Sequence, residues 1–138
     1  MLFRSPRPRI VLAEDHAEMA EQLRNLLAFE FDVVAVVPDG QALLRAAEAA
    51  HPDVIVTDIV MPELDGIAAT AALLAKHPDV RVVLVTVHDE PELVERGHAA
   101  GALGFVAKHR AGHELLPAVK AVLRGERYVS RPAREKGN

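Results

Sequence analysis

Five short apolar runs recur along the chain, separated by longer stretches that mix apolar and charged residues. Most of the runs are rich in valine and isoleucine, and their apolar residues do not alternate with polar ones. Strands that are buried on both faces of a parallel sheet show this pattern. The pattern therefore predicts five buried strands: Ile10 to Ala13, Val33 to Val37, Val54 to Val56, Val80 to Val85 and Leu103 to Val106.

Four of the stretches between and after these runs carry large apolar residues at helical spacing, three or four positions apart. Each set falls on one face of a helix and predicts an amphipathic helix packed against the sheet. In chain order the sets are Met19, Leu23, Leu26 and Leu27; Leu43, Leu44 and Ala47; Ile67, Ala71 and Leu74; and Leu115, Val119, Val122 and Leu123.

One more helix is expected over about Glu90 to Ala100. Asp89 is its predicted N-cap, and Gly101 is a natural C-terminal stop. Leu93 and Val94 are its main large apolar residues. Few large side chains bury little apolar area, so this helix is expected to be weakly held.

The alternation of strand and helix, repeated five times, predicts an α/β protein with right-handed crossovers and a doubly wound parallel sheet. The pattern covers residues 9–129, which we interpret as one domain. Residues 1–8 are expected to form an N-terminal tail, and residues 130–138 a C-terminal tail or a truncated linker. Pro117 lies early in the last helix, so that helix should start later than His113 or be kinked.

Composition narrows the class of protein. The chain has 138 residues and no cysteine, which fits a single domain and excludes a disulfide framework or a thiolate metal site. No apolar run approaches the roughly 20 residues of a membrane span, and no signal peptide is evident, so a cytoplasmic protein without membrane contact is expected. The net charge of −4 argues against nucleic-acid binding by the chain as given.

Chemically active side chains follow four of the predicted strands. They are Glu14 and Asp15, Asp58, Thr86 and Lys108. The carboxyl ends of parallel strands meet at one edge of a sheet, so these residues should converge there. Two carboxylates about 4 Å apart repel by roughly 4 kcal/mol at an effective dielectric near 20. Such a cluster calls for a cation, and an incomplete cage of oxygen ligands suits Mg²⁺.

Asp58 is the strongest candidate for a nucleophile among these acids, because it ends the central strand and precedes an irregular loop. A carboxylate can attack phosphorus and form an aspartyl phosphate. Lys108 and Thr86 could then neutralise and bind the oxygens of the transferred group.

The ordered set of residues resembles the receiver domains of two-component response regulators. The set consists of Glu14-Asp15, Asp58, Met61-Pro62, Asp65-Gly66, Thr86, Phe105 and Lys108, and the resemblance covers about Arg9 to Val129. It implies a flavodoxin-like (βα)5 fold with strand order 2-1-3-4-5. It also implies a signalling domain rather than an enzyme, which takes a phosphoryl group from a sensor histidine kinase.

The resemblance also implies a role for each residue. Asp58 corresponds to the phosphoacceptor and Asp15 to a direct ligand of Mg²⁺. Glu14 would act on the ion through water, and the backbone carbonyl of Val60 would supply another ligand. Thr86 and Phe105 correspond to the switch pair, in which the aromatic ring turns inward when Thr86 moves to the phosphoryl group. Access to Asp58 would be tuned by the side chains of Val60, Val87 and His88.

Three segments are similar to the subfamily whose receivers precede a helix-turn-helix DNA-binding domain. The segments are 85–88, 101–105 and 125–130. The similarity implies transcriptional control through a DNA-binding domain absent here, with homodimerisation on phosphorylation. Two alternatives to transcriptional control remain. One is a stand-alone receiver that acts by protein contacts, and the other is an inert receiver-like dimerisation module.

A phosphatase with an aspartyl nucleophile is a less favoured interpretation, because such enzymes need an acid two residues after the nucleophile and this chain has Val60 there.

Val87 departs from the receiver pattern, which usually has a small residue after the switch hydroxyl. His109 and His113 stand at helical spacing, but without a third ligand we interpret them as surface residues.

Overall fold

The computed structural model describes residues 7–88 and 90–130. Its strands are β1 (Arg9–Ala13), β2 (Asp32–Val37), β3 (Val54–Thr57), β4 (Arg81–Thr86), β5 (Gly104–Ala107) and β6 (Tyr128–Val129). Its helices are α1 (Ala17–Leu27), α2 (Gly40–Ala50), α3 (Gly66–Lys76), α4 (Pro91–Ala100) and α5 (Ala111–Leu123), with a 3-10 turn η1 (Lys108–Arg110) before α5. All the strands and helices predicted from the sequence are confirmed.

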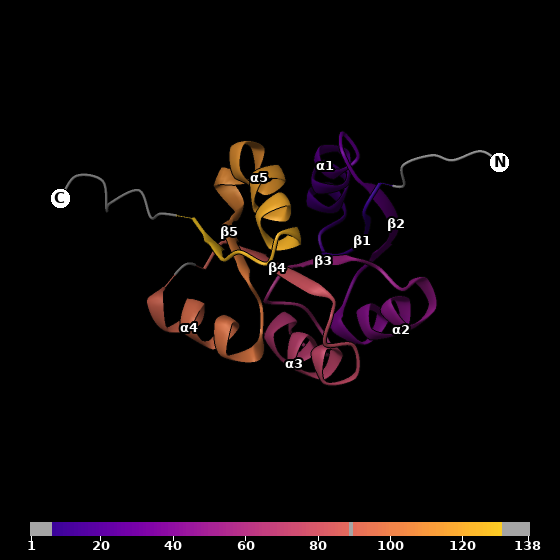
Figure 1. Ribbon diagram of the computed structural model, residues 1–138, viewed down its shortest axis with the longest axis vertical. Helices are drawn as coiled ribbons and strands as arrows, with labels where there is room; N and C mark the ends of the chain where they lie inside the picture. The colour runs from indigo at the N-terminus through magenta and orange to yellow at the C-terminus, as the bar shows by residue number, and fades with distance from the viewer. Residues whose placement is uncertain (1–6, 89, 131–138) are drawn as a thin grey trace.

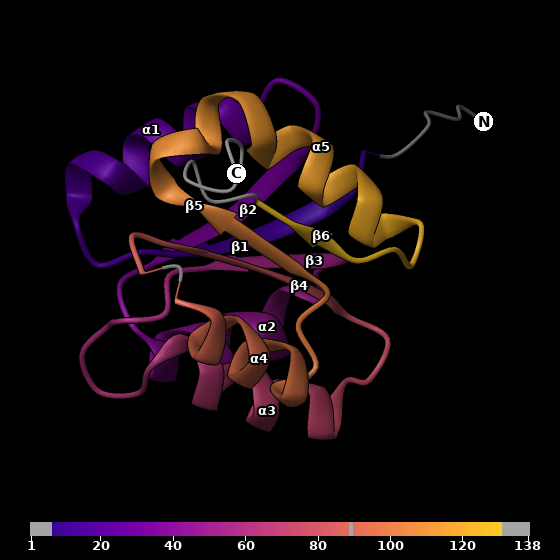
Figure 2. The same ribbon diagram turned by 90° about the vertical axis from the view of Figure 1, so that its left-hand side faces the viewer.

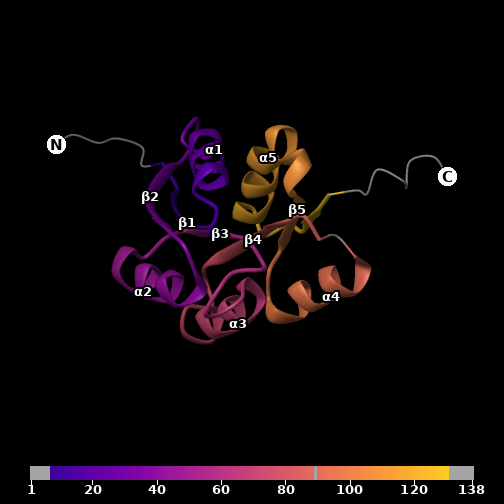
Figure 3. The same cartoon turned by 180° about the vertical axis from the view of Figure 1, so that it is seen from behind.

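The strands form one parallel sheet in the order β2-β1-β3-β4-β5-β6, which confirms the predicted order of the first five. Helices α1 and α5 cover one face, and α2, α3 and α4 cover the other (Figures 1 and 2). The view from behind shows the same division (Figure 3). The strand order reverses between β1 and β3, and in such sheets the crevice at the carboxyl ends of the strands is the usual binding site.

The sixth strand corrects the prediction of five. Tyr128 and Val129 pair in parallel with Gly104 and Phe105 of β5, directly after α5. Only two residues long, this strand has neither the length nor the apolar run that marks a buried strand in a sequence. Without β6, β5 would be the edge strand of the sheet, and β6 pairs with that edge.

A separate apolar core fills each face of the sheet. One core joins the sheet to α1 and α5, and the other joins it to α2, α3 and α4. Strands β1, β3, β4 and β5 place residues in both cores, which explains their continuous apolar runs. Strand β2 lies at the edge, and its residues are only partly buried or exposed.

Pro117 lies inside α5, which begins at Ala111, so the first of the two alternatives, a start after His113, is wrong, and a kink at the proline stays a prediction. An internal proline costs about 3 kcal/mol because it removes a hydrogen bond and crowds the preceding turn. Leu115 and Val119, on either side of Pro117, are both fully buried at 0% exposure. Burial of these side chains offsets the cost and fixes the helix from its first turn.

Helix α4 ends at Gly101, which adopts the left-handed conformation (φ 113°) as predicted. Glu90 precedes the helix, and Asp89, the predicted N-cap, lies outside the described residues. Gly97 is the one fully buried residue of α4. Leu93 and Val94 are partly buried, so the structure confirms how little α4 contributes to the core.

Candidate functional site

The predicted site residues occupy the carboxyl ends of four adjacent strands. Glu14 follows β1, Asp58 follows β3, Thr86 ends β4, and Lys108 follows β5. The sheet is parallel throughout, so all of them lie at the same edge. The acidic residues on β1 and β3 flank the point where the strand order reverses.

Lys108 joins two of the acids directly. Its Nζ donates a hydrogen bond of 2.9 Å to Asp58 Oδ2 and lies 2.8 Å from Glu14 Oε1 in an ion pair. The side chains are 9% exposed for Lys108, 7% for Asp58 and 0% for Glu14. Removing Lys108 would leave two buried carboxylates without their positive partner, which costs about 3–5 kcal/mol.

Backbone contacts fix the position of Asp58. Its N–H donates to the carbonyl of Ala13 (3.0 Å), and its Oδ1 accepts from the N–H of Ile59 (2.7 Å). A Cβ atom added at Gly66 would lie 2.0 Å from the carbonyl oxygen of Asp58. Only glycine therefore allows the start of α3 to pack against the backbone of Asp58 and Ile59. Asp65 caps this helix by accepting from the N–H of Ala68.

Burial and charge act in opposite directions at this site. Burial raises the pKa of Asp58 above its ordinary value, although the hydrogen bond and charge of Lys108 partly offset the rise. Burial acts to lower the pKa of Lys108, but hydrogen bonds to Glu14 and Asp58 outweigh it, and the pKa is raised. The lysine therefore stays positively charged at neutral pH.

A group of donor atoms suited to a hard cation lies beside this pair. Glu14, Asp15 and His16 each offer one ligand atom, and these atoms all lie within 4.8 Å of one another. His16 Nδ1 is 3.2 Å from Glu14 Oε2 and 3.4 Å from Asp15 Oδ1. Glu14 Oε1 is buried and, apart from its ion pair with Lys108, has no hydrogen-bond partner among the described residues.

These donors fit Mg²⁺, because carboxylate oxygens are its preferred protein ligands and Asp15 is open to the water that Mg²⁺ retains.

Sequence reasoning missed His16, since a histidine directly after two acids carries no spacing signal of its own. His109 and His113 are exposed, and the described residues show no metal-ligating group around them.

Thr86 and Phe105 are buried but make no direct contact with the acids that the structure records. The Thr86 hydroxyl accepts a hydrogen bond from the N–H of His88 (3.1 Å). Phe105 is 2% exposed and belongs to the core between the sheet and α4. A Cβ atom at Gly97 would lie 3.8 Å from the Phe105 ring, so the ring packs inward against α4.

Apolar side chains surround the approach to the site. Val87 and Val60 are 67% and 59% exposed, far more than most valines of this chain. Val60 and His88 line a shallow groove of about 370 Å³ between the loop after β3 and the start of α4.

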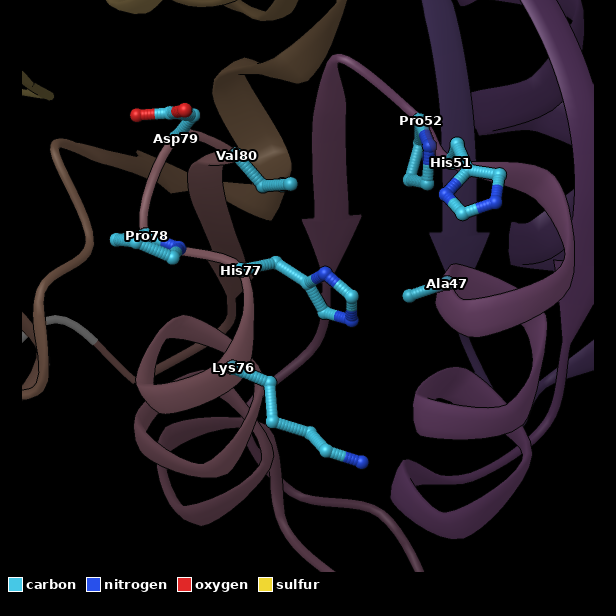
Figure 4. A pocket seen from close by; sticks show the side chains of 8 residues that line it. All are labelled: Ala47, His51, Pro52, Lys76, His77, Pro78, Asp79 and Val80. Carbon is cyan, nitrogen blue, oxygen red and sulfur yellow. The ribbon is translucent and has the colours of Figure 1, made fainter.

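A second groove, of about 280 Å³, lies at the opposite end of the sheet (Figure 4). His51 and His77 project into it from the ends of α2 and α3. His77 Nε2 lies 3.3 Å from Glu48 Oε1, so this histidine joins the two helices. The groove is remote from the acids at the carboxyl ends of the strands.

Residues 10–120 match the family described as the response regulator receiver domain. The chain belongs to this family. Among curated proteins, the receiver is 37% identical to the transcriptional regulatory protein DegU of Brevibacillus brevis, over 88% of the chain and 52% of DegU. It is 33% identical to the probable transcriptional regulatory protein NarL of Mycobacterium tuberculosis, over 91% of the chain and 61% of NarL.

Solved structures agree with this assignment. The signal receiver domain of the response regulator NarL from Mycobacterium tuberculosis superposes with a TM-score of 0.84 at 32% identity, covering 88% of this chain and all of that one. A LuxR-family response regulator from Aurantimonas gives a TM-score of 0.88 at 30% identity, covering 94% of each chain.

The receiver spans 52–61% of the length of the curated relatives named above. These relatives are transcriptional regulators by name rather than enzymes. Within residues 7–88 and 90–130, no helix has both the length and the apolar character needed to cross a bilayer.

Proposed function

We propose that this receiver is phosphorylated on Asp58 by a sensor histidine kinase, with Mg²⁺ bound by the neighbouring acids. The observation that carries the proposal is the contact of Lys108 with both Asp58 and Glu14 at the switch point of the sheet. A buried ammonium bound to the acceptor carboxylate lies next to the oxygens that a phosphoryl group on Asp58 would add. The other site residues supply what the transfer needs.

In the proposed transfer, a carboxylate oxygen of Asp58 forms a bond to phosphorus. The bond between phosphorus and the donor imidazole nitrogen breaks, and the imidazole leaves with the electron pair. Asp15, Asp58 and the Val60 carbonyl, with Glu14 acting through water, would hold Mg²⁺, which when bound would supply positive charge to oxygens of the phosphoryl group. Lys108 pairs with another oxygen and stabilises the product charge.

The added charge, about −1.5 to −2, then acts on residues of β4 and β5. We propose that the Thr86 hydroxyl leaves the N–H of His88 and donates to a phosphoryl oxygen. Phe105 already lies inward, so the aromatic position of the switched state is compatible with the present packing. Helix α4 has little to hold it in place, and its equilibrium between two positions would shift.

Val60, Val87 and His88 are proposed to control how easily water and donors reach Asp58. The two exposed valines place apolar side chains at the approach to the site. Replacing Val87 with alanine is expected to speed dephosphorylation, which a time course of phosphoprotein loss would measure.

The output is proposed from the relatives. Transcriptional regulators of about twice this length suggest a helix-turn-helix domain in addition to the receiver, and DNA binding would occur through that domain. Phosphorylation would promote homodimerisation, in the cytoplasm where the kinase's catalytic part lies. A receiver that acts alone through protein contacts is the alternative.

The test of the proposal is phosphorylation by acetyl phosphate with Mg²⁺, followed by intact-protein mass spectrometry. Wild type should gain the mass of one phosphoryl group, and omission of Mg²⁺ should abolish the gain. Asp58→Asn should not be modified. Asp79→Asn, which changes an exposed acid at the other end of the sheet, is the matched control and should behave as wild type. Phosphate uptake by Asp58→Asn would contradict the proposal.

A further inference from the structure

The C-terminal segment Tyr128–Ser130 is attached to the strand that leads to Lys108. Strand β6 pairs with β5, and the N–H of Ser130 donates to the carbonyl of Phe105 (2.9 Å). Sequence reasoning placed Ser130 in a tail, but this residue is buried at 8% exposure and belongs to the folded unit. Its contacts are therefore part of the receiver's structure.

The Ser130 side chain is at the centre of a polar group, which we call the Ser130 cluster (Ser130, Glu114 and Arg110). The Ser130 hydroxyl accepts from the N–H of Ala107 (3.1 Å) and donates to Glu114 Oε1. Glu114 Oε2 accepts from Arg110 Nε (3.0 Å). Burial acts to raise the pKa of Glu114, but the hydrogen bonds from Ser130 and Arg110 lower it overall, so the carboxylate is charged and binds both donors firmly.

The cluster binds the chain on both sides of Lys108. Ala107 directly precedes the lysine and is bonded to Ser130, while Arg110 ends the η1 turn that begins with the lysine and is bonded to Glu114. The backbone of this turn is thereby held in the position that places Lys108 Nζ against Asp58 and Glu14. A movement of the turn must stretch at least one of these hydrogen bonds.

Phosphorylation requires the Lys108 ammonium to move. Lys108 Nζ lies 2.9 Å from Asp58 Oδ2, which leaves no room for a phosphorus atom and its oxygens between them. The ammonium must withdraw to pair with the new oxygens, and any part of this shift that the flexible lysine side chain does not take up moves the turn, which the Ser130 cluster restrains. We propose that the cluster is a positioning device that opposes phosphorylation, and that phosphorylation in turn loosens the attachment of Tyr128–Ser130.

This inference rests on the proposed function and adds a coupling to it. Coupling between two sites is reciprocal, so a change at Ser130 must alter ligand affinity at Asp58 by the same factor that occupancy of Asp58 alters the cluster. One hydrogen bond contributes about 1 kcal/mol, which corresponds to about a fivefold change in affinity. In a regulator with an output domain, this segment would carry the signal away from the receiver.

The first measurement is amide hydrogen exchange of the whole chain by NMR, with Mg²⁺ alone and with Mg²⁺ plus beryllofluoride, a phosphoryl analogue. Binding of the analogue is followed separately through the fluorine signal. The N–H groups of Ala107 and Ser130 should exchange at least about fivefold faster with the analogue, while that of Val56 in β3 should not change.

The second measurement is the affinity for beryllofluoride in variants. Ser130→Ala and Glu114→Gln should bind about fivefold more tightly than wild type. Ser130→Thr keeps the hydroxyl and should behave as wild type. Glu30→Gln is the matched control, because it removes an ion pair to α5 (Lys120 Nζ to Glu30 Oε1, 2.8 Å) far from the cluster.

The outcomes separate the two proposals. If wild type binds the analogue but exchange and variant affinities stay unchanged, the coupling is refuted and the proposed function stands. Weaker binding by Ser130→Ala would also refute it, because the cluster would then support the phosphorylated state. If wild type fails to bind the analogue, both proposals are overturned.

Discussion

Replacing Lys108 with methionine removes the positive charge between two buried acids and keeps most of the apolar stem. Each ion pair, at 2.8 Å to Glu14 and 2.9 Å to Asp58, contributes a gross attraction of about 6 kcal/mol at an effective dielectric near 20. The cost of burying the ammonium cancels much of this attraction. Loss of one partner from a buried set is expected to lower the free energy of unfolding by about 3–5 kcal/mol.

The pH dependence of the loss follows from the pKa shifts. The raised pKa of Lys108 means that its contribution is fully present below its ordinary pKa of 10.5, and hence at pH 7.5. Without the lysine, ionisation of Asp58 is disfavoured further, and protonation of Asp58 at lower pH relieves the repulsion. The loss should therefore be largest at pH 7.5 and smaller at pH 5.5. Mg²⁺ should restore more stability to the variant than to wild type, because it replaces the missing positive charge.

The assay is urea unfolding followed by far-ultraviolet circular dichroism, at both pH values, with and without millimolar Mg²⁺. Lys76→Met is the control: this lysine is 71% exposed and lies 3.8 Å from Glu48, so its loss should cost less than about 1 kcal/mol. A loss below about 1 kcal/mol for Lys108→Met at pH 7.5, or one that grows on acidification, would refute the reasoning.

Three further changes test the site and its support. Asp58→Asn should raise the free energy of unfolding at pH 7.5 without Mg²⁺, because burial raises the pKa of Asp58 and disfavours its charged form. In urea titrations this gain should vanish below the ordinary pKa of 3.8, where Asp58 is protonated in both the folded and the unfolded state. Gly66→Ala should lower stability by more than about 2 kcal/mol, since its Cβ would lie 2.0 Å from the Asp58 carbonyl, and unchanged urea midpoints would contradict the close packing. Phe105→Ala should lower the free energy of unfolding by about 3–5 kcal/mol, because Phe105 is buried in the core. Phe29→Ala is the control, because this side chain is 78% exposed and its loss should change thermal stability little. Equal effects of the two changes would show that Phe105 is not packed as described.

The site was predictable because it depends on strand ends. A buried parallel strand is visible as an apolar run, and the next polar residue must emerge at the carboxyl edge of the sheet. Asp58 and Lys108 are 50 positions apart in the chain, yet the pattern alone indicated that they would meet, and the structure places them 2.9 Å apart. The roles of the site residues in phosphorylation remain predictions to be tested.

Other features had no signal in the sequence. The position of His16 beside two acids depends on how the first turn after β1 bends. Pro117 predicted either a later helix start or a kink, and the helix begins before the proline because the burial of the neighbouring side chains outweighs the local cost. Local preferences of about 1–3 kcal/mol are smaller than the apolar burial that a whole helix face provides.

The sequence by itself determined the alternation of strands and helices, the order of chemical groups along the sheet edge, and the family. These depend on periodicity and on residue type, which are local properties. Only the tertiary structure decided that β6 extends the sheet, that Ser130 is buried, and that Ala107 and Arg110 are held on both sides of Lys108. The reason is that the contacts of β6 and Ser130 join segments well separated in the chain, and these partners meet only after the apolar core has brought them together.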